Sequence, residues 1–182
     1  MTVREDQPSL RVIEGGGSAG GASLVSGPSV GSQLGLPGFS PPRQALICTT
    51  VGVLAALGFD ALLSDLDVRR IVDLRVAPSF LRLGLRGREF VRRAEHFGAD
   101  YIHLAALANR FAGESWDGER YRQRLERHYQ ENWEAVAQLR GLVEDGPVLL
   151  ITAERSGLEQ ELLLGALGRL SPGFEVRELA GT

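Results

Sequence analysis

The sequence contains no lysine, only one cysteine and no long apolar run. Every one of the twenty basic residues is therefore arginine, a bias that we attribute to a GC-rich genome before anion recognition. The single cysteine, Cys48, excludes an intramolecular disulfide and a thiolate metal cluster, so no metal site is expected. No apolar run approaches the roughly 20 residues of a membrane helix, so no membrane contact is expected either.

The charge balance of the 182 residues is slightly acidic, with a net charge of −3 and a pI of about 5.7. A protein whose main role is to neutralise phosphate backbones would be basic, so we do not expect nucleic acid as a partner. Residues 1–6 end in three charged side chains and no apolar signal segment follows them, so no secretory signal is expected. These features together predict a cytoplasmic protein.

Glycine, serine and proline dominate residues 15–42, which end in a Pro41-Pro42 pair. Such a composition buries too little apolar surface to offset its chain entropy. We therefore predict a disordered arm over residues 1–43 and a single α/β domain over residues 44–182.

The remainder alternates between short apolar runs and helical periods, a pattern typical of a parallel sheet with crossover helices. Strands are predicted at residues 45–51, 71–74, 101–104, 148–152 and 174–177. Helices are predicted near residues 55–66, 90–97, 118–143 and 158–170. The expected fold is a three-layer, parallel or mostly parallel sheet of about five strands with helices on both faces, Rossmann-like or flavodoxin-like. The very apolar strand at 148–152 should lie at its centre.

Polar side chains stand where these predicted strands end, and open parallel sheets bind ligands beyond the carboxyl ends of their strands. The residues at those ends are Thr49, Thr50, Asp73, Arg75, His103, Thr152 and Glu154. We expect the three threonines, Asp73 and Arg75 to bind a ligand. His103 and Glu154 are the candidates for catalysis.

Asp73 and Arg75 are two positions apart, so on a continuous strand they share a face. The carboxylate could then orient the guanidinium toward an anion. Alternatively, Asp73 caps a neighbouring helix or loop and Arg75 pairs with it structurally. Five further arginines, interrupted by two glycines, form a candidate positive rim or mobile lid over the pocket; they are Arg82, Arg86, Arg88, Arg92 and Arg93.

His103 could act as an acid, a base or a hydrogen-bond donor near neutral pH, or it could be a packed side chain. Glu154 follows the most buried strand, where desolvation raises the pKa of a carboxyl group and favours a general base. The alternative for Glu154 is an ion pair with Arg155 or a loop arginine. Cys48 lies inside a predicted strand, where burial keeps a thiol inert.

Established cofactor motifs are absent from the sequence. No G-x-G-x-x-G follows a predicted strand, and there is no P-loop, nucleophile-elbow serine or metal-ligand spacing. No cofactor is therefore expected.

Three segments resemble the bacterial family of domain of unknown function 488. They are Val72-Asp73-Leu74-Arg75 with Pro78, Tyr101-Ile102-His103-Leu104 with Leu107, and Leu150-Ile151-Thr152-Ala153-Glu154. The family's pattern has a His where this chain has Val51, a Gly-Gly turn at Ala108-Asn109, and Cys-His-Arg where Leu158-Glu159-Gln160 stands. The resemblance implies that the fold carries over and that Asp73, Arg75, His103 and Glu154 are what remains of the family's site.

Two functions follow as hypotheses. The first is a catalytically degenerate module that binds a small anionic ligand or a protein partner. The second is a hydrolase or transferase in which His103, Glu154 and the Asp73/Arg75 pair act on a phosphorylated or nucleotide-like substrate. The missing His and Cys-His-Arg positions favour the first.

Overall fold

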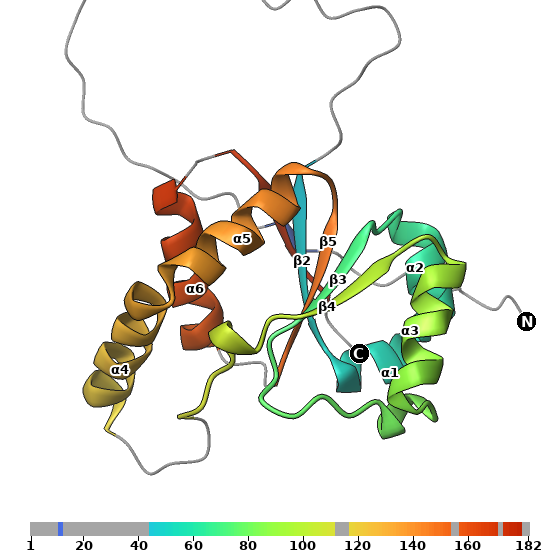
Figure 1. Cartoon of the computed structure of the whole chain (residues 1–182), viewed down its shortest axis with the longest axis horizontal. Helices are drawn as coiled ribbons and strands as arrows, with labels where there is room; N and C mark the ends of the chain where they lie inside the picture. The colour runs from blue at the N-terminus through green and yellow to red at the C-terminus, as the bar shows by residue number, and fades with distance from the viewer. Residues whose placement is uncertain (1–10, 13–43, 112–116, 154–156, 171–172, 180–182) are drawn as a thin grey trace, which may run out of the picture.

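A six-stranded sheet organises the chain (Figure 1), with the strand order β1-β6-β2-β5-β3-β4. The structure is a computed structural model that describes residues 11–12, 44–111, 117–153, 157–170 and 173–179. The strands are β1 (Arg11–Val12), β2 (Ala45–Thr50), β3 (Arg70–Asp73), β4 (Asp100–His103), β5 (Val148–Thr152) and β6 (Glu175–Glu178). Strands β2 to β6 are parallel, and β1 pairs with β6 in the antiparallel sense.

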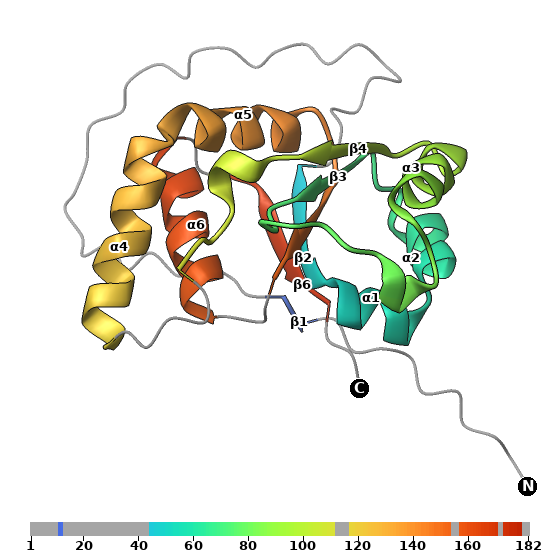
Figure 2. The same cartoon turned by 60° about the horizontal axis from the view of Figure 1, so that its bottom comes forward.

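Helices cover both faces of this sheet (Figure 2). One face carries α1 (Val51–Leu57), α2 (Phe59–Leu66) and α3 (Gly87–His96), and the other carries α4 (Gly118–Glu131), α5 (Trp133–Glu144) and α6 (Gly157–Leu170). Two short 3₁₀ turns are η1 (Leu81–Leu83) and η2 (Ala105–Leu107). The predicted three-layer α/β fold with five parallel strands is thereby confirmed.

The strand order differs from the orders of the Rossmann and flavodoxin folds. Numbered along the chain, the five parallel strands lie in the order 5-1-4-2-3. Rossmann and flavodoxin sheets have the orders 3-2-1-4-5-6 and 2-1-3-4-5. The layers are therefore those expected, whereas the connections between them are arranged differently.

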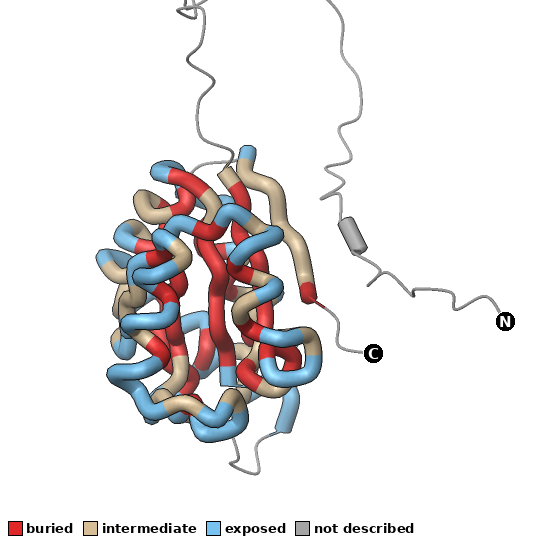
Figure 3. Tube along the Cα trace, turned by 90° about the vertical axis from the view of Figure 1, so that its right-hand side faces the viewer, coloured by how far each residue is buried: buried red, intermediate tan, exposed pale blue. Residues whose placement is uncertain are grey.

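Strand β5 lies at the centre, as its apolar sequence predicts, because it pairs with β2 on one side and β3 on the other. Its side chains alternate between the two layers. Val148 and Leu150 pack toward α4, α5 and α6, whereas Leu149 and Ile151 pack toward α1, α2 and α3. The buried stretches of the chain are accordingly concentrated in the middle of the molecule (Figure 3).

Two helices predicted as continuous are each broken. The helix expected over residues 55–66 is α1 and α2, separated at Gly58, whose φ of 86° ends the first helix. Helix α1 begins earlier than expected because the hydroxyl of Thr50 caps the amide of Val53. The helix expected over residues 118–143 is α4 and α5, separated at Asn132.

The arginine-rich segment is mostly regular structure and not the mobile loop that its glycines suggested. Arg82 belongs to η1, which ends at Gly84 with a φ of 69°, and the last three arginines of the set belong to α3. The segment is helical because it has a hydrophobic stripe, with Phe90 and Ala94 buried against the sheet.

Most of the arm predicted for residues 1–43 lies outside the described residues. Its one described piece is β1, whose residues pair with Arg177 and Glu178 of β6. Among the helices described, none combines the length and apolar character that crossing a membrane requires.

Candidate functional site

The connections that leave β2, β5 and β3 diverge at the carboxyl edge of the sheet. The chain passes from β2 into α1 and from β3 toward α3, both on one face, whereas it passes from β5 to α6 on the other face. Adjacent strands whose connections leave to opposite faces form a topological switch point, the place where open parallel sheets bind ligands. Two such switch points therefore flank β5.

A pocket of about 250 Å³ opens at this edge. The three strands all contribute to its lining, which consists of Thr50, Val51, Gly52, Arg75, Ser79, Leu81, Arg82, Thr152 and Ala153. The structure thus brings Thr50, Arg75 and Thr152 together, as the strand ends predict.

Asp73 and Arg75 form a tight pair behind this pocket. The Nε of Arg75 donates to Oδ1 of Asp73 at 2.9 Å, and its Nη2 donates to Oδ2 at 2.6 Å. The side chain of Asp73 is fully buried, and that of Arg75 is 12% exposed. Arg75 also lines the pocket. It is therefore both a pocket residue held in place by Asp73 and a member of a buried ion pair.

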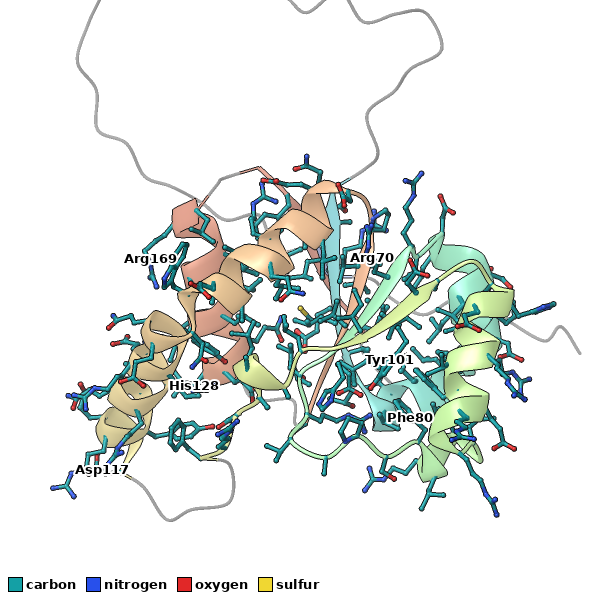
Figure 4. All side chains as sticks on the ribbon, in the orientation of Figure 1. Arg70, Phe80, Tyr101, Asp117, His128 and Arg169 are labelled. Carbon is teal, nitrogen blue, oxygen red and sulfur yellow. The ribbon has the colours of Figure 1, made fainter. Side chains whose placement is uncertain are left out.

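Other contacts fix the guanidinium of Arg75 in place. Its Nη1 donates to the carbonyl oxygen of Ser79 at 2.8 Å, and its carbon Cζ lies 4.8 Å from the ring centre of Phe80. The hydroxyl of Tyr101 donates to Oδ2 of Asp73 at 3.2 Å. Burial first, and then the charge of Asp73, raise the pKa of Tyr101, so its hydroxyl remains a donor. Figure 4 shows Phe80 and Tyr101 close together beside the sheet.

The threonines at the strand ends divide into lining and supporting residues. The Oγ1 of Thr50 accepts from the amide of Val53 at 3.3 Å, which leaves its hydroxyl proton available to a ligand. The hydroxyl of Thr152 donates to the carbonyl oxygen of Thr49 at 3.4 Å. Thr49 is buried and is not among the residues that line the pocket, so it supports the wall from behind.

Arg82 brings a second guanidinium to the pocket. Of the five arginines predicted as a positive rim, it is the one that lines this pocket. Its Nη1 lies 3.5 Å from the position that a Cβ on Gly52 would occupy. Arg82 is exposed, and no carboxylate of the described residues forms an ion pair with it. Gly52 and Ser79 also line the pocket, and sequence reasoning missed both because Gly52 has no polar side chain and Ser79 does not stand at a predicted strand end.

The two catalytic candidates are not part of the described pocket wall. His103 is exposed on the edge strand β4, and its Nε2 lies 2.9 Å from the carbonyl oxygen of Arg75. Because a carbonyl oxygen only accepts, this Nε2 carries the proton. Glu154 lies outside the described residues. Cys48 is buried, and burial first and then the charge of Glu178 raise the pKa of its thiol to about 12, which favours the protonated form.

A second polar cluster, which sequence reasoning missed, lies on the opposite face. The amide nitrogen of Asn109 donates to the hydroxyl oxygen of Tyr121 at 2.7 Å and to Oε2 of Glu159 at 3.0 Å. Asn109 and Glu159 are both buried. These bonds fasten the segment after β4 to α4 and α6. The only sequence signal for them is that Asn109 and Glu159 stand at departures from the family pattern.

The family model described as Domain of unknown function DUF488 matches residues 58–158, more than half of the chain. The matched span includes Asp73, Arg75, Arg82 and Thr152, and hence most of the pocket wall. No curated protein and no solved structure matches the chain.

Proposed function

The chain belongs to the DUF488 family, and from that premise we propose that it binds a small anionic ligand at the switch-point pocket without turning it over. The observation that carries this proposal is the convergence of Arg75 and Arg82 on one pocket at the carboxyl edge of the sheet. Two guanidinium groups at such an edge favour a planar or tetrahedral oxyanion such as a carboxylate or phosphate.

The two arginines contribute differently to the charge of the pocket. The carboxylate of Asp73 offsets the charge of Arg75, so this pair supplies direction more than net charge. Arg82 has no such partner among the described residues and therefore supplies the net positive charge. Arg82 should consequently dominate the affinity for an anion.

The dimensions of the pocket favour a small ligand. Its volume of about 250 Å³ is below the range of roughly 300–1,000 Å³ that drug-sized ligands occupy. An inorganic oxyanion or a small phosphomonoester fits this space, whereas a dinucleotide exceeds it.

The chemistry of the lining favours binding over turnover. The described lining residues include threonine, serine and arginine, and none is a histidine, cysteine, aspartate or glutamate that could transfer a proton at neutral pH. The alternative is a hydrolase or transferase acting on a phosphorylated substrate. It has one observation in its favour, which is that Glu154 follows directly on Ala153 of the pocket wall.

Isothermal titration with inorganic phosphate tests the proposal. We expect saturable binding that Arg82→Ala weakens by about tenfold or more, because a hydrogen bond to a charged group contributes about 1.5–3 kcal/mol. The matched control is Arg169→Ala, which should leave the affinity unchanged. Arg169 lies in the last turn of α6 (Figure 4). No saturable binding, or equal loss in both variants, would contradict a specific pocket.

Turnover is tested separately with para-nitrophenyl phosphate. The proposal expects no release of nitrophenol above the rate of the buffer. Release that Glu154→Gln abolishes would instead establish the hydrolase alternative.

A further inference from the structure

The strand β4 leaves one edge of the sheet open. It is the last strand in the order, and among the described strands it pairs only with β3. The amides of Asp100 and Leu104 point toward β3, because they donate to the carbonyl oxygens of Arg69 and Asp73. Since amide directions alternate along a strand, those of Tyr101 and His103 point to the open edge. Two residues of β4 are therefore positioned to pair with another strand.

A groove of about 480 Å³ lies beside this edge. Its floor is apolar, with Phe80, Val91 and Tyr101, and one wall is the outer stripe of helix α3. Tyr101 thus belongs both to the open strand and to the groove. A strand paired with β4 would place alternate side chains on the same face as Tyr101, and hence in this groove.

The charges along the groove favour an acidic occupant. Arg88 and Arg92 are exposed, stand one turn apart on α3 and both line the groove, against one carboxylate, that of Glu95. The described residues provide neither arginine with an ion pair. The groove therefore combines an apolar floor with a net positive wall.

We propose that β4 and this groove bind an extended peptide segment of a partner protein by strand addition. The segment carries an apolar side chain two positions from a carboxylate, so that both face α3. Backbone pairing with Tyr101 and His103 provides affinity, and the groove selects the side chains. This site is separate from the anion pocket and does not depend on it.

The probe is a fluorescein-labelled peptide of sequence Thr-Glu-Thr-Phe-Thr-Glu-Thr, titrated with the full chain by fluorescence anisotropy. We expect saturable binding and slower hydrogen exchange at the amides of Tyr101 and His103. Two further peptides carry N-methyl groups on alternate backbone amides, one on the odd-numbered residues and the other on the even-numbered residues. At least one of these two peptides should fail to bind. A version with lysine in place of glutamate should bind about tenfold more weakly or worse.

Matched variants locate the site. Val91→Asp in the groove should weaken binding by about tenfold or more, whereas Leu170→Asp on the exposed end of α6 should not change it. Arg92→Glu should weaken binding in the same way, and Arg127→Glu on α4 should not. Thermal unfolding curves check that each variant folds.

Three results would overturn the proposal. One is absence of binding by the glutamate peptide. Another is equal binding by both methylated versions or by the lysine version, because strand pairing or charge selection would then be lacking. The third is self-association that protects Tyr101 and His103 without peptide, because a second copy of the chain would then occupy the edge.

Discussion

The two helical layers differ in how completely their buried polar groups are hydrogen-bonded. On the side of α1, α2 and α3, the carboxylate of Asp73 accepts hydrogen bonds from the backbone amide and guanidinium of Arg75 and from the hydroxyl of Tyr101. On the side of α4, α5 and α6, the hydroxyl of Tyr129 and two guanidinium nitrogens of Arg140 are buried without a hydrogen-bond partner among the described residues. One layer satisfies its polar groups, and the other leaves several of them unsatisfied.

This difference indicates what each polar group does. The bonds around Asp73 hold Arg75 at the pocket, so they fix the direction of a side chain that lines it. Tyr129 belongs to an apolar cluster, and the guanidinium of Arg140 lies over Phe174, with Cζ 5.1 Å from the ring centre. Those two side chains fill space with their apolar parts, and the Nη2 of Arg140 also forms an ion pair with Oε1 of Glu144 at 3.2 Å.

The largest expected effect comes from Arg75→Ala, which leaves the buried carboxylate of Asp73 without its cation. We expect the free energy of unfolding to fall by about 3–5 kcal/mol, measured by urea denaturation. The double variant Asp73→Asn/Arg75→Ala should recover part of this loss. Arg82→Ala is the matched control and should stay within about 0.5 kcal/mol of the parent. A stable Arg75→Ala protein would show that the pair is held for the ligand alone.

The second-largest expected effect concerns a single hydroxyl group, that of Tyr101. Tyr101→Phe removes a donor to the carboxylate of Asp73, so we expect a loss of about 1.5 kcal/mol. This value lies at the lower end for hydrogen bonds to charged groups because the side chain is only half-buried. Denaturation curves in parallel with the parent protein measure it, and no loss would mean that Arg75 alone satisfies Asp73.

The third effect depends on pH and belongs to the other layer. Burial first, and then the charge of Arg110, lower the pKa of His128 below its ordinary value of about 6.5. Below that pH the unfolded chain binds a proton that the folded protein does not, so stability falls as the pH is lowered through this range. The loss from one group is at most about 1.4 kcal/mol per pH unit.

Comparison with His128→Gln isolates this contribution. The parent should lose more stability than the variant between about pH 7 and about pH 5, because only the parent carries the titrating group. Equal losses in the two proteins would place the origin of any acid sensitivity elsewhere.

The smallest effect is the counterpart of Tyr101→Phe. Tyr129→Phe removes a buried hydroxyl that has no partner among the described residues, so stability should stay the same or rise by up to about 1 kcal/mol. The rise in the pKa of Tyr129 has the same origin, burial first and then the charge of Glu159. Thermal unfolding of Tyr101→Phe and Tyr129→Phe, measured in parallel, checks this difference. If Tyr129→Phe lost as much stability as Tyr101→Phe, the two layers would not differ in this way.

The fold was largely predictable because its signals are local. The apolar run at Val148–Thr152 is the observed β5, and its burial on both faces follows from the lack of polar alternation. The helix breaks at Gly58 and Asn132 were missed because the apolar periodicity continues across both. Only the positive φ of Gly58 and the packing of the flanking helices separate them.

The candidate site was predictable in part. Sequence reasoning located Thr50, Arg75 and Thr152 through their position at strand ends, and these residues do line one pocket. It could not select Arg82 from five neighbouring arginines, because that choice depends on the turn η1 and on the space beside Gly52. It did not predict the hydrogen bond between Asn109 and Glu159, which are 50 positions apart.

The sequence by itself determined the layers, the central strand and the strand ends at which polar residues gather, since each depends on patterns within a few neighbouring positions. Only the tertiary structure decided the strand order, the pairing of Asp73 with Arg75 and Tyr101, and the place of β4 at the edge of the described sheet. These features join segments distant in the chain, and their energies depend on burial and direction that no local pattern contains.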